Sequence, residues 1–469
     1  MKALSKRLYP ILLAVALAGS AFQGGLYLRR LEEGAVSAAK APPQASALLK
    51  LNPERAPVRL ETLKTLQGPD EECKSLFSSV LRLVKEHYVE KITEADESKM
   101  ARGAVQGMLD ALQDPDTRLI EPEDRKLLEN AEAGKFNGMG AVLALRKEKI
   151  GSLDTIKVVV VAPLPGSPAS EAGIKAGDCI THVDGKWIIA YDPFSEPEVE
   201  KARKALRNGQ IDVASYNKVI EEAEKRLKNG LLIPDALEKL TANTSGTIDL
   251  TLERPQSKTP IQVKVHCRTT AVDPVMSRNL NGGLAYIRVS QFTKRAQTEF
   301  ANEMDKVEAE RAKGIVLDLR DNAGGAIDAV TSVASRFTGG GVLATIQEKN
   351  RRHNIRVPKT RAISIPVVVL VNGGTSSVAE LLAGTLRDCL HAPLVGLRTF
   401  GDGLVQTPVI LKDGSVVLIT TGKMLTPQGT DFEGKGLEPD VVVENKGPVD
   451  AQLAAAEKIL RSALAGRKT

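Results

Sequence analysis

The feature of this chain that most constrains its fold is a regular alternation of strand-like and helix-like segments between residues 284 and 387. Short runs rich in Val, Ile and Leu alternate with stretches whose apolar residues recur at helical spacing. Such an alternation predicts βαβ units and a mainly parallel sheet. We expect strands over Leu284–Val289, Ile315–Leu319 and Pro366–Val371, helices over Ala296–Lys313, Ala326–Phe337 and Val378–Arg387, and a last helix over Ala451–Leu464.

Residues 136–270 show a second pattern, in which short β-type runs are separated by Gly and Pro. Val158–Val161, Ile180–Val183 and Ile248–Leu252 are such runs, and they predict a small β domain. A highly charged stretch over about residues 192–230 has helical spacing and interrupts the β pattern. We interpret this stretch as a helical insertion that forms a solvated hairpin.

The remaining segments complete a multidomain α/β prediction. Residues 69–135 repeat apolar side chains at helical spacing, for example Leu76, Val80 and Leu83, with a further helix expected to open at Pro122. We therefore expect a helical region over 69–135, a β domain over 136–270, an α/β core over 271–445 and a C-terminal helix within 446–469.

The first 34 residues have the features of an export signal. Basic residues precede an apolar stretch from Leu8 to Leu28, and Arg29 and Arg30 follow it. Because 21 residues are just enough to cross a bilayer, the stretch predicts a cleaved signal peptide or a signal anchor. Residues 35–68, rich in Ala and Pro, are expected to be a linker. We expect an exported protein, periplasmic or otherwise extracytoplasmic, either released or anchored in the inner membrane.

The composition argues against several classes of function. The net charge is only +6, no long basic run occurs, and aromatic residues make up 3% of the chain, so a nucleic-acid partner is not expected. The four cysteines include no C-x-x-C pair, and the five histidines show no metal-ligand spacing. We therefore expect neither a metal nor a cofactor.

The first candidate site is the segment Asn372–Glu380, where an apolar strand enters a Gly-rich turn and a helix begins near Ser377. A hydroxyl at such a turn is exposed at the edge of the sheet, and the N–H groups at the helix start can stabilise an oxyanion. This is the arrangement of a nucleophile elbow, although the G-x-S-x-G spelling is absent. The alternative is structural, because Ser377 and Glu380 also form a capping box.

Three further segments could assist such a site. Leu317–Ala326 contains Gly324 and Gly325 after a buried strand, so its N–H groups could serve an oxyanion or a phosphate, or merely make a tight turn. A P-loop is excluded because the Gly-Lys-Ser/Thr sequence is absent. Thr399–Gln406 is a glycine-flanked loop that leads into a strand. Phe136–Val142 is a Gly-rich strand entry whose free N–H groups could hold the carboxylate of a peptide.

Together, in this order, these segments resemble the C-terminal processing peptidases, exported serine peptidases that carry a PDZ domain. The resemblance runs from about residue 70 to residue 465 and implies a PDZ-like domain over 136–270 and a peptidase core over 271–445. The matching segments are Gly166–Asp178 with Val183–Lys186, Ala285–Arg288, Leu317–Gly325, Asn372–Glu380, Thr399–Gln406 and Thr420–Pro427.

The resemblance assigns roles to individual residues. It implies that Ser377 is the nucleophile, that Gln406 assists the base, and that oxyanion donors are the N–H of Val378 and one from the Gly324–Gly325 turn. The peptide carboxylate would bind in the PDZ-like domain through the strand entry formed by Gly138, Met139, Gly140, Ala141 and Val142. Protein or peptide C-termini are the implied partners.

One position departs from the family pattern. The lysine base of the family lies between two glycines, and Asp402 occupies that position here. An aspartate has a reference pKa near 3.9 and is a weak base toward a hydroxyl, so the loss of the lysine is expected to cost about 10²–10⁴ in rate. Lys423 and His391 are alternative bases. Two hypotheses therefore remain: a serine endopeptidase with altered chemistry, and a catalytically inactive peptide-binding pseudopeptidase.

Overall fold

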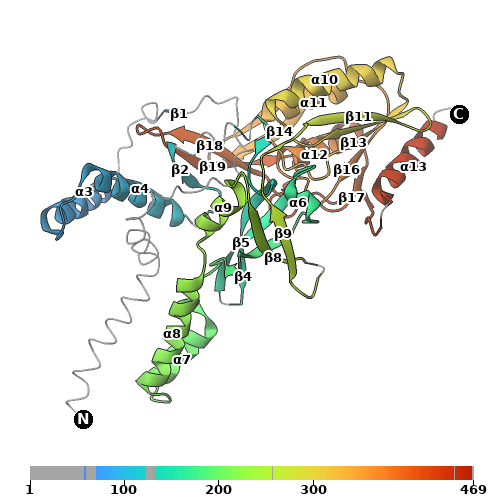
Figure 1. The fold of residues 1–469 in the computed structure, drawn as a ribbon. Coiled ribbons are helices and arrows are strands. Elements are labelled where there is room, and N and C mark those ends of the chain that lie inside the picture. Colours follow the sequence, from blue (N-terminus) through green and yellow to red (C-terminus); the bar gives the residue numbers. More distant parts are fainter. Residues whose placement is uncertain are drawn as a thin grey trace, which may run out of the picture.

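A computed structural model describes residues 58–59, 70–112, 114–122, 130, 133–151, 153–255, 257–447 and 449–466 (Figure 1). The expected export signal over 1–34 lies outside these residues, as does the linker over 35–68 except for strand β1 (Val58–Arg59). Within these ranges, no helix is both long and apolar enough to span a bilayer.

The predicted parallel sheet forms the centre of the larger domain. Its strands run in the order β11-β12-β13-β16-β17-β20, and every neighbouring pair is parallel except β11 with β12. Apolar side chains on both faces explain the continuous apolar runs of the sequence. The strands span Val275–Leu280, Leu284–Val289, Gly314–Asp318, Val367–Val371, Leu394–Gly396 and Val441–Val442.

Helices cover both faces of this sheet, as the alternation predicts. Helices α10 (Lys294–Ala309), α11 (Ile327–Thr338) and α12 (Val378–Leu390) pack in one apolar cluster against one face. Helix α13 (Ala451–Gly466) packs against the other face, where Leu460 contacts the side chains of the strands. The expected helices and strands are confirmed in this region, with boundaries shifted by a few residues.

A second sheet of this domain was not predicted from the sequence. It has the order β1-β18-β19-β14-β15, with a short strand β2 paired to β19. Its strands are partly exposed and irregularly patterned, so no clear period-2 signal marks them. The bounds are Arg118–Ile120 for β2, Gly341–Glu348 for β14, Arg352–Val357 for β15, Leu404–Ile410 for β18 and Val416–Leu425 for β19.

The smaller β domain is a sheet of order β4-β5-β6-β8-β9, with β7 (Lys186–Trp187) paired to β6. Its core is closed by helices α6 (Pro168–Glu171) and α9 (Ile233–Thr241). Strands β3 (Lys135–Phe136) and β10 (Thr270–Ala271) pair with each other and lead the chain into and out of the domain. The strands of the sheet span Ala141–Ile150, Leu153–Pro163, Cys179–Val183, Thr247–Glu253 and Ile261–His266.

The charged insertion is helical, as expected. It contains the 3₁₀ turn η4 (Pro193–Ser195) and the helices α7 (Pro197–Arg207) and α8 (Val213–Asn229), which project from the β domain (Figure 1). Its two ends meet, because Ile189 and Leu231 are hydrogen-bonded at 2.9 Å. A hairpin with adjacent ends can extend outward without disturbing the sheet that carries it.

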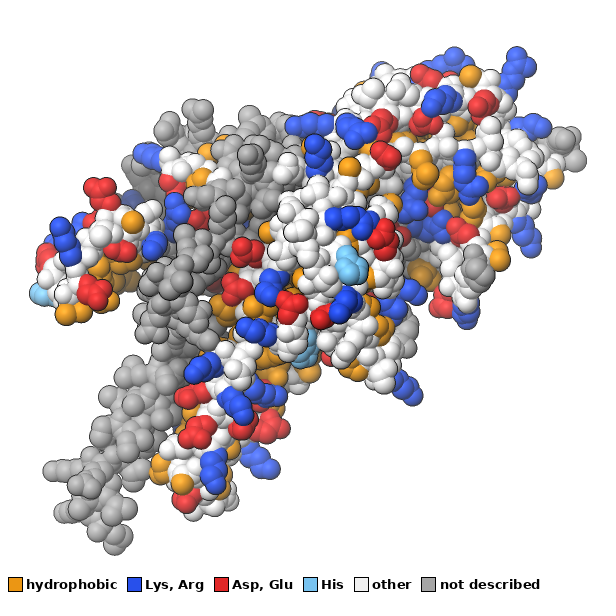
Figure 2. Space-filling model, viewed as in Figure 1, with side chains coloured by type: hydrophobic (Ala, Val, Ile, Leu, Met, Phe, Trp, Pro, Cys, Tyr) orange, Lys and Arg blue, Asp and Glu red, His pale blue; other side chains and the backbone are white. Residues whose placement is uncertain are grey.

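The N-terminal helices α3 (Asp70–His87) and α4 (Glu94–Asp110) form an arm that extends from the body (Figure 1). Leu76, Val80 and Leu83 lie exposed on α3, and hydrophobic side chains gather along one side of the arm in Figure 2. The predicted helical spacing of these residues is confirmed. The further helix expected from Pro122 falls largely in residues 123–129, outside the described part.

Candidate active site

Ser377 lies where strand β16 turns into helix α12, and its backbone is unusual. Its φ of +57° is in the left-handed region, which non-glycine residues rarely occupy. The Ser376 N–H holds the turn by donating to the Asn322 carbonyl at 2.9 Å. Ser377 and Glu380 adopt the capping-box arrangement, yet the Ser377 hydroxyl is buried without a hydrogen-bond partner in the described part of the chain. The Ser377 hydroxyl therefore makes no side-chain hydrogen bond that caps helix α12.

Glu380 connects the nucleophile turn to the loop that carries Asp402. Its fully buried carboxylate accepts hydrogen bonds from the N–H groups of Ser377 (3.0 Å), Gly401 (2.8 Å) and Asp402 (2.8 Å), and from the Thr399 hydroxyl. Burial raises the pKa of Glu380 to about 8, although these hydrogen bonds favour the charged form. One carboxylate oxygen thus accepts from both Ser377 and Asp402, which places these two residues side by side.

The Gly324–Gly325 turn lies directly against Ser377. A Cβ atom on Gly324 would be 2.9 Å from Ser377 Cβ, and one on Gly325 would be 2.3 Å from the Phe292 carbonyl oxygen, so both positions require glycine. The φ angles of +104° and +140° lead to the same conclusion. The Gly324 N–H already donates to Asn322 Oδ1 at 2.9 Å.

Two backbone N–H groups remain available beside Ser377. Neither the Gly325 N–H nor the Val378 N–H has an acceptor among the residues that the structure describes. Val378 is the first residue of helix α12, where the positive end of the helix dipole favours a developing anion. Of the two expected glycine donors, the geometry therefore favours Gly325 over Gly324 as the partner of Val378.

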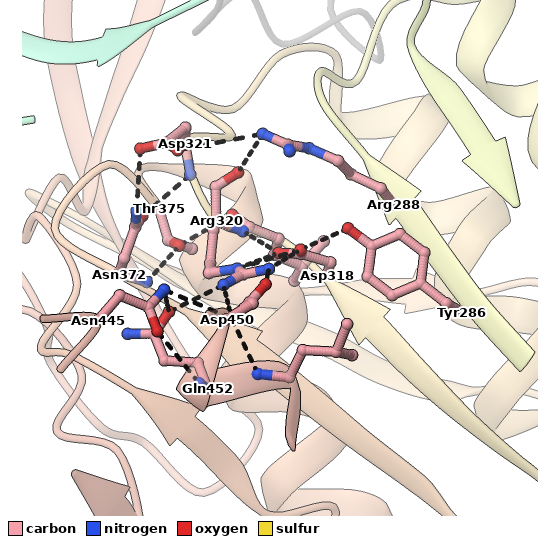
Figure 3. A network of polar contacts seen from close by, with 12 residues as sticks. Tyr286, Arg288, Asp318, Arg320, Asp321, Asn372, Thr375, Asn445, Asp450 and Gln452 are labelled. Atoms are coloured by element: carbon pink, nitrogen blue, oxygen red, sulfur yellow. Dashed lines mark hydrogen bonds and ion pairs between the residues drawn. The ribbon is translucent and has the colours of Figure 1, made fainter. Parts of the chain in front are cut away.

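A network of polar contacts holds the loop that follows β13 and the loop that follows β16 (Figure 3). The Arg320 guanidinium donates to Asp318 at 2.6 Å and to Asp450 at 2.8 Å, which links the end of β13 to the start of α13. Although burial opposes its charge, these carboxylates raise the pKa of Arg320. The Tyr286 hydroxyl donates to Asp318 at 2.7 Å, and burial raises the pKa of Tyr286.

The same network joins the two glycine-containing loops to each other. The Asn372 side chain accepts from the Asp321 N–H at 2.9 Å and donates to the Asp321 carboxylate at 2.9 Å. The Thr375 hydroxyl donates to the Leu319 carbonyl at 2.8 Å. The positions of the nucleophile turn and the Gly324–Gly325 turn are thus set by shared hydrogen bonds rather than by packing alone.

Gln406 comes from the second sheet and is supported by the N-terminal region. Its side chain is fully buried, and Nε2 donates to the Thr420 hydroxyl at 2.7 Å. Thr420 in turn donates to Asp114, which follows helix α4 and was not among the residues predicted to form the site. The Gln406 Oε1 atom has no partner within the described ranges, so it remains free to accept a hydrogen bond.

The two alternative bases are less suited to serve Ser377 than Asp402 is. His391 lies away from Ser377, and Lys423 is close to a carboxylate of its own. His391 caps the far end of helix α12, which is 13 residues long, so it lies about 20 Å from the end that begins after Ser377. Lys423 is 48% exposed, and its Nζ atom lies 3.7 Å from Asp431. Asp402 is the titratable residue that the loop brings next to Ser377.

The strand entry of the β domain differs from expectation in one respect. The N–H groups of Gly138 and Met139 are not free, because they donate to the carbonyls of Asn243 (2.7 Å) and Leu240 (2.9 Å) at the end of α9. The sequence could not show that this helix end closes over the loop. Strand β4, which follows with Ala141 and Val142, is an edge strand of its sheet, so its outer side can pair with an added strand.

The β domain also covers the candidate active site. Val142 packs with Ala323 and Phe400 in one buried cluster, and the Arg146 guanidinium lies 3.9 Å from the Phe400 ring centre. Ser377 itself is only 1% exposed. No group of three His, Cys, Asp or Glu residues in the described ranges could hold a metal ion.

Comparisons with known proteins agree with this geometry. The model of peptidase family S41 matches residues 283–443, and that of the PDZ domain matches residues 159–196. The carboxyl-terminal-processing protease of Synechocystis is 30% identical over 82% of this chain and 82% of its own length. That of Picosynechococcus is 32% identical over 76% of each chain. The solved photosystem II D1 C-terminal processing protease superimposes with a TM-score of 0.59 and 26% identity, covering 82% of this chain and 97% of its own.

Proposed function

The chain belongs to peptidase family S41, among the carboxyl-terminal-processing proteases with a PDZ domain, and from this premise we propose that it is a serine endopeptidase acting through Ser377. The observation that carries the proposal is the buried Ser377 hydroxyl, which has no hydrogen-bond partner among the described residues, together with the N–H groups of Val378 and Gly325, which have no acceptor there either. A hydroxyl in that position has a place for the oxyanion that its attack on a peptide carbonyl creates.

The proposed reaction follows from this arrangement. Ser377 Oγ attacks the carbonyl carbon, its proton passes to the Asp402 carboxylate, and the N–H groups of Val378 and Gly325 receive the oxyanion. The proton then goes to the leaving amine as the C–N bond breaks, and water hydrolyses the acyl-enzyme ester. Because Asp402 is a weaker base than lysine, the first step is expected to be slower by about 10²–10⁴.

Glu380 lies next to the proposed oxyanion position, and burial raises its pKa to about 8, which moderates the negative charge that this carboxyl group places there. Its role in the proposal is positional, since it holds the backbone of Ser377 and that of Asp402 at one carboxylate.

The substrates in this proposal are protein C-termini. The edge strand β4 supports it, because an extended peptide can pair there with its carboxylate near the Gly138–Val142 entry. Opening of this entry requires that α9 release the N–H groups of Gly138 and Met139. The apolar N-terminal stretch supports an exported location, with a membrane contact through that segment if it is not cleaved.

A second candidate function rests on one observation, the aspartate at position 402. Without its lysine, the chain could bind peptides and not cleave them. The experiment that separates the two functions is cleavage of an unfolded protein with an apolar C-terminus, followed by mass spectrometry. The proposal expects slow release of C-terminal fragments by the natural protein and none by Ser377→Ala. Equal rates for the two proteins would refute it.

A further inference from the structure

Several segments that build the candidate active site carry buried polar groups without a hydrogen-bond partner in the described part of the chain. The hydroxyls of Ser376 and Ser377, the Oε1 atom of Gln406 and both amide atoms of Gln291 have no hydrogen-bond partner among the described residues. Each of these side chains is at most 1% exposed. A buried polar atom without a partner is costly, so native proteins pair nearly all of them. The unpaired groups therefore call for a functional reason, and Gln291 has no role in the reaction described above.

The backbone of Gln291 is fixed next to the oxyanion turn. The following residue, Phe292, donates its N–H to the Gly324 carbonyl at 3.0 Å and accepts from the Ala326 N–H at 2.7 Å. The preceding residue, Ser290, donates to the Pro274 carbonyl at 2.8 Å. Since Gly324 touches Ser377, the loop that carries Gln291 forms the support of the candidate active site.

The chemistry of the unpaired group indicates its ligand. A glutamine amide offers two N–H donors and one carbonyl acceptor, and a peptide bond offers the complementary carbonyl and N–H. We propose that Gln291 hydrogen-bonds the main chain of an extended polypeptide bound at Ser377 and so positions the bond to be cleaved. This inference rests on the proposed function and identifies the peptide backbone, rather than a side chain, as the feature recognised there.

A structural role for Gln291 predicts the opposite set of effects from a binding role. If its amide serves the substrate, Gln291→Met removes unmet polar atoms and raises the melting temperature by about 2–4 °C, while it weakens peptide binding about tenfold. If the amide instead holds a buried water, the same change lowers the melting temperature and leaves peptide binding unchanged. Tyr216→Phe is the matched control, because the Tyr216 hydroxyl is likewise buried without a partner within the described part but lies in the projecting helix α8. This control should be stabilised with no change in binding.

The decisive experiment is a binding cycle between Gln291 and single backbone groups of a peptide. In the full chain carrying Ser377→Ala, the affinity of a fluorescent peptide is measured by anisotropy, together with a series of the same peptide N-methylated at one position at a time. At one position of the peptide, N-methylation should lower the affinity for the protein that retains Gln291 about tenfold. The same N-methylation should have little effect on the affinity for the Gln291→Met protein. Gln291→Asn, which withdraws the amide by one methylene, replaces Gln291→Met if the latter does not fold.

The outcomes separate this proposal from the proposed function. Coupling at one peptide position supports the role of Gln291 even if no variant cleaves any substrate. Equal effects of every N-methylation in both proteins overturn it, even if Ser377-dependent cleavage is observed. A natural chain that binds none of the peptides overturns both proposals together.

Discussion

Replacing Asp402 by lysine should supply a stronger base beside Ser377. The backbone at this position is held by its own hydrogen bonds, because Glu380 accepts from the Asp402 N–H at 2.8 Å and Glu433 accepts from the Gly403 N–H at 2.6 Å. Gly401 is equally fixed, since a Cβ atom there would be 2.7 Å from the Gly436 nitrogen. Asp402→Lys therefore changes the chemistry of the site while its backbone stays in place.

The size of the effect follows from the neighbours of the new amine. Glu380 places the backbone of residue 402 beside that of Ser377, so the lysine chain can reach the hydroxyl. Burial lowers the pKa of such an amine from about 10.4, which makes the neutral base available near pH 8. A positioned general base contributes about 10²–10⁴ in rate, so turnover should rise at least about 10²-fold over the natural protein.

The assay compares cleavage of an unfolded protein with an apolar C-terminus by the natural chain, Asp402→Lys, Asp402→Asn and Asp402→Lys with Ser377→Ala. Asp402→Asn is the matched control, because it removes the carboxylate without supplying a base. We expect a gain for Asp402→Lys alone and its loss when Ser377→Ala is added, since the two groups act as a unit. The reasoning would be contradicted if a folded Asp402→Lys protein cleaved no faster than the natural chain. It would also be contradicted if Asp402→Asn raised the cleavage rate as much as Asp402→Lys does.

Three further predictions concern other parts of the molecule. Amidation of a peptide C-terminus should weaken its binding by about 1–3 kcal/mol through the Gly138–Val142 entry, measured by titration calorimetry, and equal affinities for acid and amide would exclude carboxylate capture there. Replacing residues 192–230 by a short Gly/Ser link should preserve cooperative urea unfolding, because Ile189 and Leu231 already adjoin; loss of cooperativity would show that the insertion belongs to the core. Burial raises the pKa of Glu380 from 4.5 to about 8. Between these two values the folded state binds a proton that the unfolded state has released, so the free energy of unfolding should fall as pH rises from about 5 to about 8. The dependence should be weaker in Glu380→Gln, and identical slopes in urea titrations would refute the burial argument.

The central sheet could be predicted because burial on both faces leaves a strong mark in the sequence. Val367–Val371 is an uninterrupted apolar run, and the helices between the strands have clear apolar faces. The second sheet left no such mark: β15 lies at its edge and carries three basic side chains in six residues, and β18 contains Gln406 and Pro408. Its pairing depends on tertiary contacts between segments far apart in the chain, such as β2 with β19.

The candidate site could be predicted only where a motif carries it. Ser377, Gly324 and Gly325 lie in short segments with strong local signals, and the structure places the Gly324 turn against Ser377. The link from Glu380 to the 399–402 loop and the support of Gln406 through Asp114 are contacts between distant segments, so no local pattern reveals them. Gln291 gives no sequence signal at all, because its unusual property is that, once buried, its amide has no partner among the residues that the structure describes.

The most direct test of the central claim is to identify the residue that becomes covalently modified during turnover. The natural chain and Asp402→Lys are incubated with a peptide ester ending at an apolar residue, quenched in acid and analysed by intact mass and peptide mapping. The account predicts an acyl group on Ser377, formed faster in Asp402→Lys and absent from Ser377→Ala. Acylation of another residue, or cleavage of the ester by Ser377→Ala at the natural rate, would contradict the assignment of Ser377 as the nucleophile.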